Sequence, residues 1–335
     1  MGAYIIGSGM HLPERVVTNE EIAESLGLEP EFIFKSSGIR RRRWASPGTT
    51  TSSLACVALT QALGDARVNT EDVDYLLFGT MTPDRFIPGS APSVQKHLGF
   101  CEIPCLDIRA TCCNMLYGLQ LAKALVSSGV AQCVAICLAE IQSAWLELSP
   151  QVGTISMLFG DGASAVIVTN EPRDNALEIL DIHIATDGSY VDDLGIRCPG
   201  TEFGTARTYS LNENISAYSA SMNGQSVILQ ASRKMVTACQ TVLERNRLTA
   251  ADVRWVVPHQ ANAKLLARVV RDIHFPADEG GVINILEGTG NTSSASMGMA
   301  LDTLRRSTNI RPNDYLLLPA FGAGFTWGAG LCRAL

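Results

Sequence analysis

Short apolar runs alternate with amphipathic stretches along most of this 335-residue chain. The apolar runs have the length of strands and lack polar alternation, which is the pattern of strands buried on both faces. The stretches between them have helical periodicity. The pattern therefore predicts an α/β protein with helix-covered sheets. The clearest apolar runs are 75–78, 134–137, 165–168, 256–257 and 315–318.

One pattern in the first half of the chain returns in the second. Residues 67–77 (RVNTEDVDYLL) are echoed by 247–257 (RLTAADVRWVV), with Asp72 and Asp252 at matching places before the apolar run. Chance could produce so short an echo, but the order of helix, turn and strand is shared, which favours a duplication. The amphipathic helical stretches that precede the two copies are 52–66 and 232–246.

A polar turn, NEPRDN at 170–175, separates the two copies. We therefore expect two similar halves, 1–172 and 173–335. The sequence has no low-complexity segment and no long linker between them.

The net charge of the chain argues against some classes of binding partner. The formal net charge is −7, which argues against general nucleic-acid binding and against a polybasic membrane anchor. No segment reaches the roughly 20 apolar residues that a membrane-spanning helix needs, and the chain does not start with the basic residues of a signal peptide. We expect a cytoplasmic protein.

Ten cysteines are present, without the paired C-x-x-C spacing of a zinc site, so no metal site is predicted. Most are best interpreted as small buried residues, since free cysteine is among the most buried residue types. This applies to Cys56, Cys101, Cys105, Cys133, Cys137, Cys198, Cys239 and Cys332.

Three segments carry candidate chemistry. Cys112 lies between a short strand and a long helical stretch, and a cysteine at a helix N-terminus is favoured as thiolate. His259 follows a buried strand, where sites gather in α/β folds. Residues 288–296 form a Gly-rich turn that opens a helix and contains Asn291. Each also has a structural alternative: a buried small residue, a structural histidine and a simple N-cap.

Taken together, these residues indicate a resemblance to one particular family. Cys112, His259 and Asn291, in this order, resemble the Cys-His-Asn triad of β-ketoacyl-acyl-carrier-protein synthase III, a condensing enzyme of the thiolase superfamily. Further segments of the chain resemble the same family in register. They are IGSG (6–9), SGIR (37–40), FGDGA (159–163), DGS (187–189), PHQAN (258–262), GNTS (290–293) and FGAGFTWG (321–328).

The family implies a thiolase fold, in which two βαβαβαββ halves stack in five αβαβα layers, usually in a homodimer. It also implies an acyltransferase without a cofactor, whose substrates are acyl groups carried by CoA or phosphopantetheine. Cys112 would hold the acyl primer, and His259 and Asn291 would act on malonyl-acyl-carrier protein in a decarboxylative condensation. By analogy, the oxyanion hole comprises the backbone N–H groups of Cys112 and Ala323. Cys113 is expected to pack.

The substrate contacts depart from the family pattern. Relatives that take acyl-CoA stack its adenine between a Trp and an Arg, where this chain has Phe32 and Ser36, and another usual arginine is Gly153. We therefore expect weaker CoA binding, or a primer that arrives on a carrier protein. Ile87 replaces an aromatic residue that closes the partner subunit's acyl pocket, which favours longer or branched primers. The resemblance also assigns substrate contacts to Asn262 and Phe321.

Lys264, Arg268 and Arg271 share one face of the helix expected after His259. Such a face is often solvated surface, but the resemblance assigns it to docking of an acidic acyl carrier protein. Arg40–Arg43 form a second basic cluster, in which Arg40 belongs to the SGIR segment and structural ion pairing is expected for Arg41, Arg42 and Arg43.

Two other functions remain open at this point. The first is a relative from specialised metabolism that loads a starter unit or transfers an acyl group to another acceptor. The second is a non-catalytic subunit of a condensing heterodimer, against which the complete triad argues.

Overall fold

The computed structural model describes residues 2–201, 218–276, 281–307 and 309–335. Its main sheet has ten strands in the order β12-β11-β13-β14-β8-β1-β7-β6-β4-β5. The strands are β1 (Tyr4–His11), β4 (Tyr75–Gly79), β5 (Cys105–Ile108), β6 (Cys133–Glu140), β7 (Gly162–Thr169), β8 (Leu177–Thr186), β11 (Val253–Val256), β12 (Gly281–Val282), β13 (Tyr315–Gly322) and β14 (Thr326–Ala334). Two small sheets pair β2 (Arg15–Thr18) with β3 (Arg41–Trp44) and β9 (Leu194–Gly195) with β10 (Ser221–Met222).

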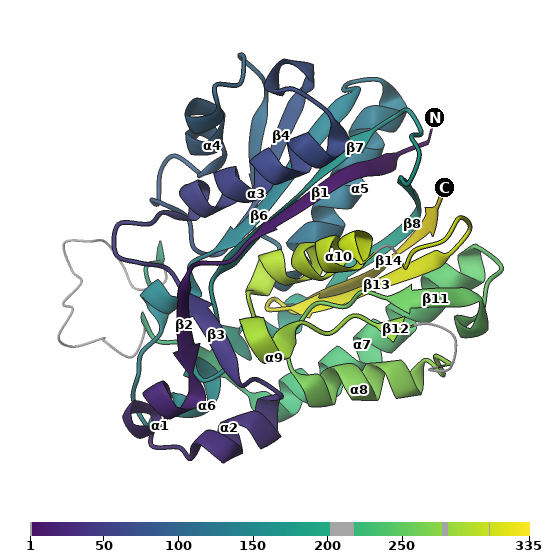
Figure 1. The fold of residues 1–335 in the computed structure, drawn as a ribbon. Coiled ribbons are helices and arrows are strands. Elements are labelled where there is room, and N and C mark those ends of the chain that lie inside the picture. Colours follow the sequence, from purple (N-terminus) through teal and green to yellow (C-terminus); the bar gives the residue numbers. More distant parts are fainter. Residues whose placement is uncertain (1, 202–217, 277–280, 308) are drawn as a thin grey trace.

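Helices form three layers around these strands (Figure 1). An outer layer covers β1, β4, β6 and β7, a central layer lies between the two groups of strands, and another outer layer covers β11, β13 and β14. The outer helices are α3 (Thr51–Ala66) and α4 (Ala91–Leu98) on one side and α7 (Gly224–Arg245) and α8 (Ala263–Asp272) on the other. The central helices are α5 (Asn114–Ser128) and α10 (Ser296–Arg306). The remaining helices are α1 (Asn19–Leu26), α2 (Pro30–Ser37), α6 (Gly153–Ser156) and α9 (Leu286–Thr289).

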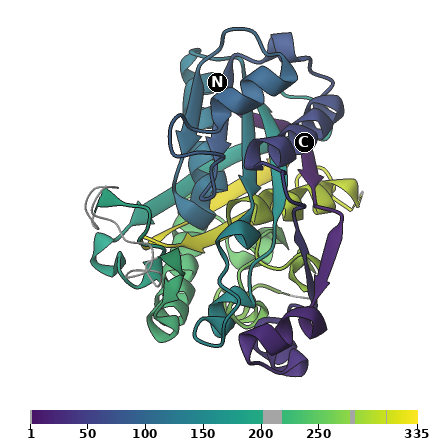
Figure 2. The ribbon, with the colours of Figure 1, turned by 90° about the vertical axis from the view of Figure 1, so that its left-hand side faces the viewer.

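Strands from before residue 172 occupy one end of the sheet and strands from after it occupy the other. The two groups meet where β1 pairs with β8, and β8 also pairs with β14. Both chain ends therefore lie at this junction, close together in both views (Figures 1 and 2). The boundary between halves at 172/173 falls in the connection from β7 to β8, and descent of the halves from a duplication stays a prediction.

The echoed segments adopt the same local structure. Arg67 and Arg247 both take positive φ angles, 52° and 58°, at the end of a helix. A short 3₁₀ turn follows each, and Asp72 and Asp252 accept hydrogen bonds from the backbone N–H three residues earlier, at 2.9 and 2.7 Å. These carboxylates cap the turn and direct the chain into the next strand. The aspartates thus have a structural role in both halves.

Strand burial follows the prediction from the apolar runs. Every residue of β6 and β7 is buried, as expected for strands with helices on both faces.

The second amphipathic helix begins at Gly224, eight residues before the expected 232, because Asn223 caps it by accepting from Ser226 N–H. The expected burial of Cys101 is wrong: it is exposed in the loop before β5. In the described part of the chain, no helix has the length and apolarity to cross a membrane.

Candidate active site

Cys112 lies where the chain turns from the edge strand β5 into the central helix α5. A 3₁₀ turn, Thr111–Cys113, stands between the two elements, and Thr111 has a positive φ of 51°. Cys113 is fully buried and its Sγ donates to the Thr326 carbonyl at 3.5 Å, so it packs as expected. The turn therefore directs the side chain of Cys112, and not that of Cys113, toward the segment that follows Asn291.

That segment, residues 292–296, is called the serine loop, and it contacts all three residues of the predicted triad. Ser293 Oγ lies 3.5 Å from Cys112 Sγ, and Ser293 N–H donates to Asn291 Oδ1 at 2.8 Å. Ser296 Oγ lies 2.6 Å from Nδ1 of His259. The structure thus brings Cys112, His259 and Asn291 against one short stretch of chain, although the cysteine comes from the first half and the other two from the second.

His259 is held by the sheet beneath it. Its backbone N–H donates to the Pro319 carbonyl of β13 at 3.0 Å, which extends the pairing of β11 with β13. The side chain is only 2% exposed. Burial lowers the pKa of His259 to about 4, because the imidazolium would lose its hydration. The ring is therefore neutral at physiological pH.

Asn291 is positioned by the FGDGA segment. Its backbone N–H donates to Leu158 O at 2.8 Å, and its carbonyl accepts from Gly160 N–H at 3.0 Å. A Cβ at Gly160 would overlap the carbonyl oxygen of Thr289, so this close approach requires glycine. Since Oδ1 of Asn291 is occupied by Ser293, its amide NH₂ is the end left for a substrate.

The closing Gly-rich loop, between β13 and β14, covers Cys112. A Cβ at Gly322 would overlap Thr111 Oγ1 and lie 2.9 Å from the backbone nitrogen of Cys112. Thr111 Oγ1 donates to the Ala323 carbonyl at 3.1 Å. On the far side of the loop, Phe325 and Asp187 exchange two backbone hydrogen bonds, at 2.9 and 3.0 Å. The loop is therefore fastened on both sides next to the cysteine.

The expectation of a favoured thiolate at Cys112 meets an opposing effect. Part of the residue is exposed, yet protein atoms surround the sulfur densely, and this burial raises the pKa of Cys112 to about 11. The negative charge of Glu140 adds to the rise, whereas Ser293 and the cysteine's own backbone N–H lower it. The 3₁₀ turn before α5 supplies few free N–H groups, so burial outweighs the helix N-terminus in this unliganded state.

Glu140, at the end of the fully buried β6, supports the serine loop from below. It accepts from Ser294 Oγ at 2.5 Å, from Thr82 Oγ1 at 2.8 Å and from Met81 N–H at 3.1 Å. Burial raises the pKa of this carboxyl. Glu140, Ser293 and Ser296 were not predicted from the sequence, although two signals mark them: a carboxylate that ends an apolar run, and a run of serines beside Asn291.

Two family models match this chain. The one described as 3-oxoacyl-[acyl-carrier-protein (ACP)] synthase III matches residues 106–188, and its C-terminal counterpart matches residues 243–334. The beta-ketoacyl-[acyl-carrier-protein] synthase III of Nitratidesulfovibrio vulgaris is 38% identical over 330 residues, which are 98% of this chain and 97% of that protein. The chain belongs to the synthase III family.

Solved structures agree with this membership. The synthase III of Aquifex aeolicus has a TM-score of 0.88 and 30% identity, with 99% of this chain and 100% of that chain covered. The priming β-ketosynthase of the R1128 polyketide pathway has a TM-score of 0.89 and 29% identity, with 99% and 96% covered. The predicted α/β fold of the synthase III type is confirmed, and the chain is a condensing enzyme of this family.

The substrate contacts assigned by resemblance to synthase III fall into four places. Phe32 is 46% exposed on α2, and Ile87 is 77% exposed in the loop before α4. Phe321 is buried at the end of β13, with its ring centroid 4.8 Å from that of Phe325. Asn262 caps α8 by accepting from Lys264 N–H at 2.9 Å, and it donates to the carbonyl of Ser36 on α2 at 3.0 Å. Asn262 therefore links α8 to α2, the helix that carries the departures Phe32 and Ser36.

The basic face of α8 is partly neutralised within its own helix. Arg268 and Arg271 both pair with Asp272, at 3.5 and 2.9 Å. Lys264 is exposed and makes no ion pair with any described residue. Lys264 is therefore the exposed cation of this face without an ion pair among the described residues, whereas Arg268 and Arg271 share one carboxylate.

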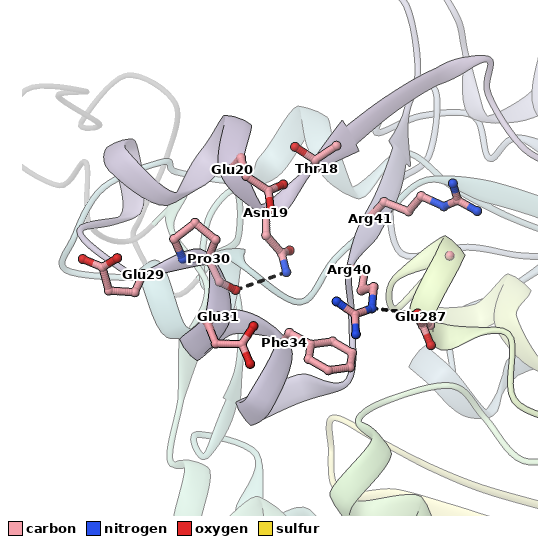
Figure 3. Close-up of a pocket in the computed structure, with 11 residues that line it drawn as sticks. Thr18, Asn19, Glu20, Glu29, Pro30, Glu31, Phe34, Arg40, Arg41 and Glu287 are labelled. Atoms are coloured by element: carbon pink, nitrogen blue, oxygen red, sulfur yellow. Dashed lines mark hydrogen bonds and ion pairs between the residues drawn. The ribbon is translucent and has the colours of Figure 1, made fainter.

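A cavity of about 840 Å³ lies between α1, α2, β3 and α9 (Figure 3). Arg40 pairs with Glu287 at 2.9 Å at its edge and stacks on Phe34, with 3.7 Å from the guanidinium carbon to the ring centroid. The described residues that line it include none of the triad. The ion pairing expected for Arg41, Arg42 and Arg43 is not found among the described residues: Arg42 is buried and donates to Asn19 Oδ1 at 2.8 Å, and Arg43 donates to the carbonyl of Glu14 at 3.0 Å.

Proposed function

We propose that this chain joins an acyl primer held on Cys112 to malonyl-acyl-carrier protein with loss of carbon dioxide, giving a 3-oxoacyl-carrier product. The observation that carries the proposal is the serine loop, which contacts the cysteine, the histidine and the asparagine together. Membership of the synthase III family indicates the class of reaction, a condensation. The proposal is that Cys112, His259 and Asn291 carry it out.

In the loading step, the Cys112 sulfur attacks the carbonyl carbon of an acyl thioester. The bond to the carrier sulfur breaks, the released thiol takes up the proton lost by Cys112, and the acyl group remains as a thioester on the enzyme. The dense surroundings of the sulfur limit access of water and so protect this intermediate from hydrolysis.

In the condensing step, the neutral His259 and the amide NH₂ of Asn291 donate to the thioester oxygen of the malonyl group. The bond to the carboxylate breaks, carbon dioxide leaves, and the electron pair forms an enolate that both donors stabilise. The enolate carbon attacks the acyl-Cys112 carbonyl. The oxygen of this carbonyl accepts hydrogen bonds from the backbone N–H groups of Cys112 and Ala323. The Cys112 thiolate departs and takes a proton from solvent.

Intact-protein mass spectrometry and carbon dioxide release test these roles separately. Cys112→Ala is expected to take up no acyl group from any thioester donor. His259→Ala and Asn291→Ala are expected to load acyl groups but to lose malonyl decarboxylation by about 100-fold or more. A His259→Ala enzyme that stays unacylated would contradict this division of labour.

A second candidate is a starter-loading enzyme of specialised metabolism, favoured by the likeness to the priming ketosynthase and by the altered contacts for CoA. Gly153 stands where the family pattern has an arginine, and a Cβ there would lie 2.5 Å from the carbonyl oxygen of Leu26. An arginine therefore does not fit without movement of the backbone. Simple transfer of an acyl group to another acceptor releases no carbon dioxide, so release from malonyl-carrier separates the two functions.

We also propose delivery of the primer by an acyl carrier protein that approaches α8. Lys264 gives this helix an exposed cation, and Asn262 connects the helix to α2, where Phe32 lacks a cationic partner for adenine. Loading at lower concentration from acyl-carrier than from acetyl-CoA supports this route. Tight, saturable loading from acetyl-CoA contradicts it. No cofactor is proposed, and a cytoplasmic location stays a prediction.

A homodimer through the β5 edge completes the proposal. β5 ends the main sheet, its Leu106 is 41% exposed, and Phe86 and Ile87 in the nearby loop are 75% and 77% exposed. Pairing of two β5 edges would cover these apolar side chains and place Ile87 at the partner's acyl pocket. Light scattering after gel filtration tests this: the chain should elute as a dimer and Leu106→Glu should dissociate it. A monomeric parent chain at micromolar concentration would exclude this assembly.

A further inference from the structure

One side chain among the described residues forms a hydrogen bond with the sulfur of Cys112, and it is Ser293. We propose that Ser293 is a catalytic residue whose hydroxyl donates to the Cys112 sulfur as negative charge develops on it. This rests on the proposed role of Cys112 as nucleophile and adds a group that the triad does not contain.

The hydroxyl has its proton available for this purpose. Ser293 is 3% exposed, and within the described residues its Oγ has no hydrogen-bond partner besides Cys112 Sγ at 3.5 Å. While the cysteine is a thiol, either atom can be the donor. Once the proton leaves, only the hydroxyl can donate, and the bond becomes charge-assisted. The interaction therefore favours the reacting form over the resting form, which is the requirement for a catalytic contribution.

The backbone conformation of Ser293 indicates that the serine side chain has a function at this position. Its φ of 47° lies in the left-handed region, which glycine adopts freely and other residues adopt only with backbone strain. The hydrogen bond from Ser293 N–H to Asn291 Oδ1 uses the backbone and needs no side chain at this position. A serine here thus accepts backbone strain while its hydroxyl faces the sulfur.

The rest of the serine loop keeps the hydroxyl in place. Ser294 is bound to Glu140, Ser296 to His259, and the carbonyl of Ala295 accepts from Ser164 Oγ at 2.9 Å. A donor fixed in this way needs no reorganisation when charge appears on the sulfur. Because burial raises the pKa of Cys112, such a fixed donor opposes the main obstacle to thiolate formation.

Ser293→Gly is the variant that isolates the hydroxyl, because glycine keeps the left-handed backbone and the N–H bond to Asn291. The rate of carbamidomethylation of Cys112 by iodoacetamide is measured against pH by peptide mapping. The midpoint is expected to rise by about one pH unit in Ser293→Gly. Below the midpoint the rate should fall about threefold, since a tenfold loss of thiolate is partly offset by its greater intrinsic nucleophilicity.

Two controls separate this role from a loosened loop. Cys101 is exposed and serves as an internal reference whose profile stays constant. Ser164→Ala removes a hydroxyl that holds the same loop through Ala295 without touching the sulfur, so its Cys112 profile should match the parent chain. An unchanged profile in Ser293→Gly, or an equal shift in Ser164→Ala, overturns the proposal.

The alkylation assay uses no acyl substrate, so its outcome is independent of the proposed function. If the parent chain takes up no acyl group from any thioester, the proposed function fails whatever the alkylation profile. If the parent chain loads and Ser293→Gly loads equally fast with an unshifted profile, only the role of Ser293 fails. In the supporting outcome, acyl loading falls by about threefold or more together with the shift.

Discussion

The hydroxyl of Ser296 lies 2.6 Å from Nδ1 of His259. The same oxygen accepts from Gln260 N–H at 3.1 Å, so its own proton is available to the imidazole. We assign the hydroxyl as the donor to Nδ1, and this assignment places the proton of the neutral ring on Nε2. Nε2–H would then be the donor that the proposed condensing step requires.

The first prediction concerns pH. Since burial lowers the pKa of His259 to about 4, the ring remains the neutral donor well below the ordinary histidine pKa of about 6.5. Carbon dioxide release from malonyl-carrier should therefore stay nearly constant from pH 8 down to about pH 5.5. The measurement uses pre-acylated enzyme, so that the titration of Cys112 does not enter. An inflection near pH 6.5 in the parent chain would show that His259 titrates at the ordinary histidine pKa and would contradict the lowering by burial.

The second prediction concerns Glu140 and stability. Burial raises its pKa in the folded state above the unfolded value, so its contribution is complete below about pH 4.5 and is lost as pH rises through the folded-state pKa. The free energy of unfolding of the parent chain, relative to Glu140→Gln, should fall with increasing pH by up to about 1.4 kcal/mol per unit between the two pKa values. Denaturant titrations at several pH values measure this difference.

Glu147→Gln is the control for this experiment. Glu147 is exposed, and hydrogen bonds from Ser219 and Ser149 lower its pKa. Its contribution should therefore have the opposite sign and be lost as pH falls. A parent-minus-variant difference at Glu140 that does not change with pH would mean that its carboxyl keeps one protonation state in both folded and unfolded chains.

The third prediction separates two functions of Asn262. Asn262→Ala removes the N-cap of α8 and should lower the free energy of unfolding by about 1 kcal/mol. Asn262→Asp keeps the cap but loses the donor to Ser36 O. If the link between α8 and α2 shapes the entrance for the substrate, Asp should raise KM for carrier-bound substrates with little change in stability. Equal stability losses in both variants would assign the whole effect to the link.

The layered fold and the position of Cys112 could be predicted because their signals are local. Buried strands such as β6 and β7 are continuous apolar runs, and the cysteine stands between a strand and a helix in a segment that resembles its family. The contacts of Glu140 with Ser294 join residues 154 positions apart, and no local pattern specifies such a pair. They became visible only when the two halves were placed against each other.

The pKa of Cys112 and the ion pairs on α8 could not be predicted from the sequence, for the same reason. The helix N-terminus that favours a thiolate is read from neighbours in the chain, whereas the burial that raises the pKa of Cys112 comes from both halves. On α8, the spacing of Lys264, Arg268 and Arg271 predicted one basic face. It did not reveal that Asp272 pairs with two of them.

The fourth prediction tests the altered CoA contacts by restoring a cation. Phe32 and Ser36 are one helical turn apart on α2, and Phe32 is 46% exposed, so an arginine at position 36 would reach the same face as the phenyl ring. Adenine could then stack between ring and guanidinium. An exposed cation–π contact is worth about 0.5–1 kcal/mol, so Ser36→Arg should lower KM for acetyl-CoA by roughly two- to fivefold.

Acetyl-pantetheine lacks the adenine, so its KM should not change in Ser36→Arg, and Ser36→Gln supplies a long side chain without the charge. An equal gain with both donors would indicate a general effect on the entrance. An equal gain in Ser36→Gln would indicate that the charge is not needed. Because the carbonyl of Ser36, and not its side chain, accepts from Asn262, the substitution leaves the link between α2 and α8 in place. A selective gain for CoA would therefore mean that the missing cation alone weakens this route in the parent chain.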